Sequence, residues 1–170
     1  MKPLPPGIEI VGLTEADIPG FRAAVGSVAA ERRWLMTLEA FPEDATRGFV
    51  RDNLLRGHPA VAARFRGTVV GWCDIVPLAP FEGFRHNGRL GMGVVAEWRG
   101  KGIGGALLDA ALALAPRAGF TRVELEAYSS NTVALELYRS RGFEFEGRKV
   151  GARILDGRVD DLICMARRSG

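Results

Sequence analysis

The sequence predicts an α/β (α+β) fold: one domain over residues 1–170, in which a mixed, mostly antiparallel sheet is flanked by helices. The length of 170 residues suits one domain and is cramped for two. Hydrophobic residues make up 47% and charged residues 25%, which is typical of a chain with a full core and excludes a disordered one. Short apolar runs with the two-residue period of strands alternate with stretches of helical period, which indicates mixed strands and helices.

The first half of the chain carries clear signals for where elements begin and end. Phe41-Pro42 ends a helical stretch, Arg56-Gly57 closes a helix that has acids in its first turn, and Arg66-Gly67 joins two apolar runs as a turn would. The expected elements are a strand over residues 8–13, a helical stretch over residues 17–40 in one or two pieces, a helix over residues 43–56, and a hairpin of residues 60–65 and 68–76.

The second half begins with a loop and ends with a hairpin. Gly91 and Gly93 within an apolar run indicate a bulge or the close approach of a ligand. Gly142 stands where a left-handed helix cap belongs, and Asp156-Gly157 is a hairpin turn pair. The expected elements are a loop over residues 78–87, a strand over residues 89–95, a helix over residues 102–118, a strand over residues 122–127, a helix over residues 131–141, and a hairpin of residues 143–154 and 159–166.

Charge and composition exclude several classes of partner. A net charge of +3 is too small for the clustered cations of a nucleic-acid stripe, although its surplus in residues 61–170 allows a small anionic ligand there. No apolar run reaches the roughly 18–20 residues that cross a bilayer, and the N-terminus has no signal-peptide pattern, so we expect no membrane partner. The two cysteines are too few for a disulfide framework or a metal cluster, which predicts no metal and a cytoplasmic protein. The sequence leaves a homodimer open.

A glycine-rich loop, residues 99–105 (RGKGIGG), connects a strand to a helix. Glycines let the main chain take unusual angles and let a ligand approach it closely. The N–H groups at the start of a helix lack intrahelical partners and favour anions, so this geometry predicts phosphate binding. Gly100, Gly102 and Gly105 also fit the dinucleotide fingerprint G-x-G-x-x-G, but only 44 residues follow Glu126, too few for the second half of a nicotinamide-binding fold.

Two segments resemble the GNAT superfamily of N-acetyltransferases. Residues 94–104 (VVAEWRGKGIG) are similar to the family's strand-four-to-helix-three segment, with its Arg-x-x-Gly-x-Gly pattern on Arg99, Gly102 and Gly104. The pattern Asn-x-x-Ala-x-x-Leu-Tyr-x-x-x-Gly-Phe, which starts at Asn131, is similar to the other recurring segment. The resemblance covers about residues 89–145. It implies a GNAT-like fold with a splayed central strand pair, and acetyl-CoA as cosubstrate.

The resemblance also implies which residues bind the cosubstrate. The backbone of the glycine-rich loop would hold the pyrophosphate, and the main chain of a splayed, bulged strand would bind the pantetheine arm and the thioester oxygen, as an oxyanion donor does. Asn131, an excellent helix N-cap residue, would also contact the cosubstrate. The implied binding residues are Met92, Gly93, Val94, Arg99, Gly100, Lys101, Gly102, Ile103, Gly104, Gly105, Asn131 and Tyr138.

Tyr138 and Glu126 are the candidate catalytic residues. A phenol is protonated at neutral pH and can give its proton to the leaving thiolate, although a tyrosine on a helix can also simply pack. Glu126 matches the active-site Glu of ribosomal-protein N-terminal acetyltransferases, which this strand resembles. It would act as the base directly or through a water relay, or else it is a surface residue paired with Arg122. Glu97 is a lower-ranked base, and His86 is a candidate for lining the acceptor site.

The sequence therefore predicts an enzyme that transfers the acetyl group of acetyl-CoA to the primary amine of a small molecule such as an amino acid. The acceptor site would be shaped by residues 31–39, the loop over residues 78–87 and the turn near Asp156. A protein N-terminal α-amine is the alternative acceptor. A non-catalytic acetyl-CoA sensor is the alternative outside the enzyme class, and Tyr138 argues against it because a pure binder needs no acid.

Overall fold

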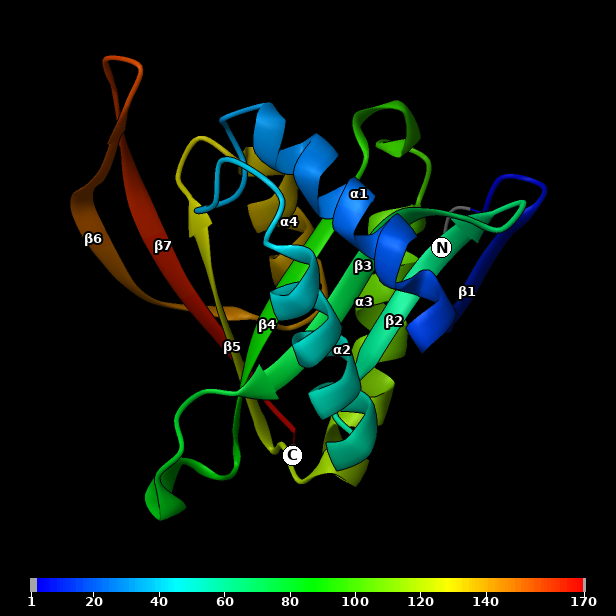
Figure 1. Cartoon of the computed structure of the whole chain (residues 1–170). Helices are drawn as coiled ribbons and strands as arrows, with labels where there is room; N and C mark the ends of the chain where they lie inside the picture. Colours follow the sequence, from blue (N-terminus) through cyan, green and yellow to red (C-terminus); the bar gives the residue numbers. More distant parts are fainter. Residues whose placement is uncertain (1–2, 170) are drawn as a thin grey trace.

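Seven strands form one sheet in the order β1-β2-β3-β4-β5-β7-β6 in the computed structural model, which describes residues 3–169 (Figure 1). All neighbouring strands are antiparallel except β4 and β5, which are parallel. This is the mixed, mostly antiparallel sheet that the sequence predicts. The strands are β1 (Ile8–Gly12), β2 (Ala60–Phe65), β3 (Thr68–Pro77), β4 (Asn87–Val94), β5 (Arg122–Tyr128), β6 (Glu144–Leu155) and β7 (Arg158–Arg168).

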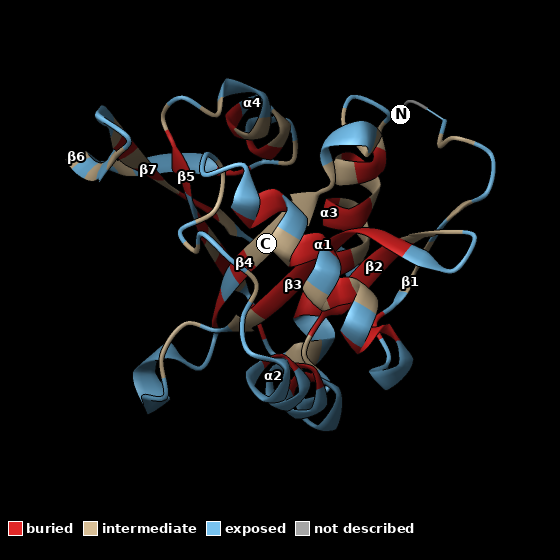
Figure 2. Ribbon diagram, turned by 45° about the horizontal axis from the view of Figure 1, so that its top comes forward, coloured by how far each residue is buried: buried red, intermediate tan, exposed pale blue. Residues whose placement is uncertain are grey.

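Four α-helices cover the sheet on its two faces. The helices are α1 (Ile18–Ala30), α2 (Glu43–Arg56), α3 (Ile103–Leu114) and α4 (Thr132–Ser140). On β2, Val61 and Ala63 belong to the core under α3 and α4, whereas Ala60 and Ala62 belong to the core under α1. The central strands are therefore buried on both faces, and the β6–β7 hairpin extends past the helices with much of its surface exposed (Figure 2).

Most predicted elements are confirmed within two or three residues, but the helical stretch expected over residues 17–40 is confirmed only as far as Ala30. It comprises a 3₁₀ turn at Glu15–Asp17 and α1, which ends at Ala30. Arg32 has a φ of 54°, which a continuing helix does not allow. Side chains from the distant hairpin hold the chain in this shape: Asp156 accepts hydrogen bonds of 2.8 and 2.9 Å from Arg32, and Arg153 donates to the carbonyls of Arg32 and Arg33.

Two further helix boundaries have local causes. α3 ends at Leu114 rather than residue 118, because Pro116 cannot donate to a helical ladder and the chain continues as a 3₁₀ turn, Ala115–Ala118. At the end of α4, Gly142 takes a φ of 79°, which confirms the predicted left-handed cap. Asp156 and Gly157 have φ values of 51° and 72°, as the predicted hairpin turn requires.

Strands β4 and β5 part after three paired positions, the last of which joins Arg89 to Glu124. On its other side β4 pairs with β3 without a register shift along its whole length, so the predicted bulge in β4 is wrong. A Cβ on Gly93 would lie 2.3 Å from the ring of Trp72, so this glycine makes room for a core side chain rather than for a ligand. The separation of β4 and β5 is the splayed strand pair that the sequence resemblance implies.

None of the helices within residues 3–169 is both long and apolar enough to span a bilayer. Over the same residues, no group of His, Cys, Asp and Glu side chains is arranged to hold a metal ion.

Candidate active site

The gap between β4 and β5 opens into a cleft of about 950 Å3 that passes from one face of the sheet to the other. On one face it is bounded by the start of α3 and by α4, and on the other by the loop after α1 and the exposed face of β5. The structure brings most of the predicted site residues together here. The predicted residues that line the cleft are Met92, Gly93, Val94, Arg99, Gly100, Gly102, Gly104, Gly105, Glu126, Asn131 and Tyr138.

The glycine-rich loop presents backbone rather than side chains to the cleft. Gly100 and Gly102 have φ values of 72° and 83°, a left-handed conformation that disfavours other residues, and Gly102 is the N-cap of α3. The first N–H groups of α3 have no intrahelical partner, and the helix dipole adds partial positive charge to them. Gly104 lines the cleft without a Cβ, so the loop fits a pyrophosphate bound mainly through main-chain N–H groups.

The charged side chains of this loop are engaged within the protein. Arg99 donates to the carbonyl of Val94 at 2.8 Å and forms a bidentate pair with Glu31 at 2.5 and 2.7 Å. Trp34 donates its indole N–H to the same carboxylate at 2.8 Å. The hydrogen bonds from Arg99 lower the pKa of Glu31 despite its partial burial. Arg99 therefore connects the glycine-rich loop to the end of α1 and the loop after it, a link that the sequence did not indicate.

The other two predicted binding residues of the loop lie outside the cleft lining. The ammonium of Lys101 stands 4.8 Å from the centre of the Trp98 ring, and Ile103 is buried in the core. Only the main chain of these two residues therefore belongs to the predicted pyrophosphate site.

Tyr138 is held on the cleft wall by packing. It comes from the inner face of α4, its side chain is 8% exposed, and its ring lies 5.8 Å from that of Phe143. Burial raises the pKa of its hydroxyl well above the usual value, so Tyr138 stays protonated at neutral pH, as an acid must. Asn131 caps α4 by accepting a 3.3 Å hydrogen bond from the N–H of Ala134, which confirms the predicted capping role.

Glu126 lines the cleft on the face opposite to α3. Its carboxylate accepts a hydrogen bond from Lys149, and the thiol of Cys164 donates to it at 3.7 Å. The predicted pairing of Glu126 with Arg122 is wrong, because Arg122 instead bonds Glu124 at 2.6 Å and also Glu146. The carboxylate is thus already engaged by an ammonium group, which suits a role in ordering a water better than one in taking a proton directly.

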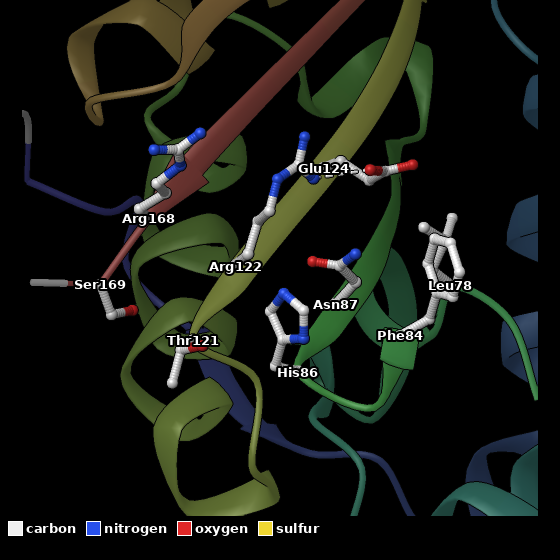
Figure 3. Close-up of a pocket in the computed structure, with 9 residues that line it drawn as sticks. All are labelled: Leu78, Phe84, His86, Asn87, Thr121, Arg122, Glu124, Arg168 and Ser169. Atoms are coloured by element: carbon white, nitrogen blue, oxygen red, sulfur yellow. Dashed lines mark hydrogen bonds and ion pairs between the residues drawn. The ribbon is translucent and has the colours of Figure 1, made fainter. Parts of the chain in front are cut away.

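The two lower-ranked candidates lie away from Tyr138. Glu97 sits in a 3₁₀ turn, Ala96–Trp98, outside the cleft lining. His86 lines a separate recess of about 570 Å3 at the start of β4 and β5, beside Asn87 and Arg122 (Figure 3). Leu78 and Phe84 line that recess too, so the expectation that the loop over residues 78–87 shapes the acceptor side of the cleft is not supported.

Sequence reasoning missed Asp74, a buried carboxyl group in the middle of β3. It is 9% exposed, and a Cβ built on Gly91, which lines the cleft, would lie 3.4 Å from its Oδ1. Burial raises its pKa to about 7. An acid inside the apolar run VVGWCDIV was the available signal.

The pKa of Asp74 predicts a pH-dependent stability. Because the folded pKa of about 7 exceeds the ordinary value of 3.8, the folded state holds a proton that the unfolded state releases, and stability falls as pH rises from about 4 to 7. Asp74→Asn removes this titration. Between pH 5 and pH 8 the wild type should therefore lose on the order of 2–3 kcal/mol relative to Asp74→Asn, measured by urea unfolding. Parallel stability curves for the two proteins would contradict the assignment.

A cleft with a glycine-rich helix start on one face of a splayed sheet is the arrangement expected of an acetyltransferase that uses acetyl-CoA. The chain matches the model of the acetyltransferase (GNAT) family over residues 26–143 and belongs to that family. The predictions of the family, of the N-acetyltransferase class and of acetyl-CoA as cosubstrate are thereby confirmed.

Three similar proteins illustrate the match. The L-methionine sulfoximine/L-methionine sulfone acetyltransferase of Pseudomonas aeruginosa is 35% identical over 159 residues, which cover 88% of each chain. The N-alpha-acetyltransferase RimI of Mycobacterium tuberculosis is 41% identical over 115 residues, 65% of this chain and 66% of that one. The structure of yncA from Salmonella typhimurium with its cofactor acetyl-CoA has a TM-score of 0.90 at 21% identity and covers 96% of this chain and 95% of that one.

Proposed function

We propose that the protein transfers the acetyl group of acetyl-CoA to the primary amine of a small, amino acid-like acceptor by direct attack of the amine on the thioester. The observation that carries this proposal is the cleft open to both faces of the sheet, since it lets a cosubstrate and an acceptor enter from opposite sides and meet between β4 and β5. The similarity to the Pseudomonas aeruginosa enzyme over 88% of both chains supports an acceptor of the amino acid class.

Each predicted residue has a role that its position supports. The main-chain N–H groups of the glycine-rich loop would hold the pyrophosphate, and an N–H group of residues 92–94 that faces the gap left where β5 parts from β4 would bind the thioester oxygen. When bound, acetyl-CoA supplies an activated acetyl group. Tyr138 would protonate the departing thiolate from the cleft wall, and Glu126 would order a water that removes the proton of the amine.

The test is thiol release from acetyl-CoA in the presence of L-methionine sulfone. Turnover of this amino acid would support the proposal. The proposal would be overturned if none of the primary amines in a broad pool caused the wild-type protein to release thiol. A thermal melt supplies the cosubstrate control. Acetyl-CoA should raise the melting temperature, because binding at one hundred times Kd adds about 2.7 kcal/mol to the free energy of unfolding. NADH should leave the melting temperature unchanged.

A protein N-terminal α-amine is the second candidate acceptor. The 41% identity to N-alpha-acetyltransferase RimI and the position of Glu126 in the cleft favour it. A ribosomal N-terminal peptide in the same assay separates the two, because the better acceptor has the higher kcat/KM. A sensor without turnover is disfavoured, since binding alone gives no reason for a buried tyrosine hydroxyl on the cleft wall.

The cytoplasm suits this proposal, because the two cysteines, Cys73 and Cys164, are free thiols. The proposed chemistry does not depend on a homodimer, because every residue assigned a role comes from one chain.

A further inference from the structure

Five charged side chains line the cleft, and four of them are engaged by other protein groups. Their partners differ in kind: Arg99 is paired with Glu31, Glu124 with Arg122 and Glu126 with Lys149, while the guanidinium of Arg33 stacks 4.3 Å from the centre of the Trp34 ring. The fifth is Arg89. Its side chain makes no ion pair and no hydrogen bond with any residue in the described range 3–169.

Arg89 stands at the point where the cleft begins. It is the last residue of β4 that pairs with β5, opposite Glu124, and its side chain lies on the face away from α3 because its neighbour Leu90 belongs to the core under α3. The carboxylate of Glu124 is already neutralised by Arg122. Glu126 raises the pKa of Lys149, and the positive charge of Arg89 opposes this rise. The acceptor side of the cleft therefore carries a positive charge without a protein partner.

The spacing along β4 places the charge of Arg89 close to the part of the cleft where β4 and β5 separate. Arg89 and Gly91 lie on the same face of the strand, about 7 Å apart by strand geometry. Gly91 presents no side chain on that face and lines the cleft, so an acceptor amine can approach the main chain there. When the amine of an acceptor lies beside Gly91, the long side chain of Arg89 reaches toward the carboxylate of that acceptor. A guanidinium binds a carboxylate with two parallel hydrogen bonds.

We propose that Arg89 binds the carboxylate of the acceptor, so that the enzyme selects amines that also carry an acid group. The inference rests on the proposed function and narrows its substrate class: α-amino acids fit, whereas polyamines and simple alkylamines do not. The two acids that line the cleft, Glu124 and Glu126, are already paired with cations, so neither is free to bind a second ammonium group.

A matched pair of amines tests this inference. L-methionine sulfone and 3-(methylsulfonyl)propan-1-amine differ only in the carboxylate. In Arg89→Gln, kcat/KM for the amino acid should fall about 10- to 100-fold, mainly through KM, as expected for a lost hydrogen bond between charged groups. The value for the acid-free amine should change less than about threefold. Arg89→Lys should recover part of the loss, because it restores the charge without the two-pronged geometry.

Arg117→Gln is the control for losing one positive charge, since Arg117 is exposed on the 3₁₀ turn Ala115–Ala118 and is not part of the cleft lining. Equal losses for both amines in Arg89→Gln, or a wild-type preference for the acid-free amine, would overturn the role of Arg89.

Failure of the proposed function gives a different result. If the wild type turns over neither amine, calorimetric titration of L-methionine sulfone into the CoA-bound protein still tests whether Arg89 binds the carboxylate. Binding that is lost in Arg89→Gln supports the carboxylate site. Equal binding by the two proteins, or no binding by the wild type, overturns it.

Discussion

Replacing Tyr138 with phenylalanine should lower kcat by roughly 10²–10⁴, the usual contribution of a general acid. The hydroxyl is the only group removed, and burial keeps it protonated and able to donate to a thiolate. Acetyl-CoA affinity should change little, because the ring that packs beside Phe143 on the cleft wall is retained. Steady-state thiol release and a calorimetric titration with acetyl-CoA on the two proteins give both quantities.

A packing role for Tyr138 makes the opposite prediction. Activity would stay nearly intact, and any loss would follow the fall in melting temperature. A thermal melt beside the kinetic assay therefore separates the two roles. Turnover by Tyr138→Phe within threefold of the wild type would remove the hydroxyl from the mechanism and leave a bound water as the acid.

Gly104→Val should weaken acetyl-CoA binding by at least about 30-fold, as the loss of one or two hydrogen bonds to a charged group would. The new side chain would stand in the path of the phosphates toward the start of α3. Its Cβ would make only ordinary contacts with the protein, the nearest being 3.5 Å from a Leu137 methyl group, so we expect the free energy of unfolding to change by only about 1 kcal/mol. Gly102 is a poorer test because its φ of 83° adds backbone strain to any substitution.

Gly48→Val in α2 is the matched control, since this helical glycine also has space around it and lies far from the cleft lining. Calorimetry on both variants gives the affinities, and urea unfolding gives the stabilities. Normal acetyl-CoA binding by Gly104→Val would mean that the glycine-rich loop is only a turn.

The parts of the fold that the sequence predicted well are those with local causes. Residues 43–56 form a helix with the predicted bounds, because its acidic first turn and left-handed Gly57 cap are encoded in neighbouring residues. The shape of the chain after Ala30 was not predictable, because Asp156 and Arg153 hold it from more than 119 residues away. Apolar spacing alone continued the helix to residue 40, and tertiary contacts override such spacing.

The candidate site divides in the same way. Two sequence motifs placed the glycine-rich loop, Asn131 and Tyr138 correctly on one cleft. The partner of Arg99 could not be predicted, since Glu31 lies 68 residues earlier on another element. Asp74 and Arg89 acquire their properties from burial and from the separation of β4 and β5, which no spacing in the sequence reveals.

The hydrogen bonds between the loop after α1 and the β6–β7 hairpin join segments that are synthesised at very different times. Synthesis proceeds from the N-terminus, so Arg32 leaves the ribosome long before Arg153 and Asp156. The residues that line the cosubstrate side of the cleft all precede the hairpin in the chain, so they are synthesised first. The acceptor side takes its shape last, when the hairpin reaches back across the sheet to Arg32 and Arg33. Contacts over such sequence separations carry a large loop-closure cost, so we expect closure of the acceptor side to be a late step of folding.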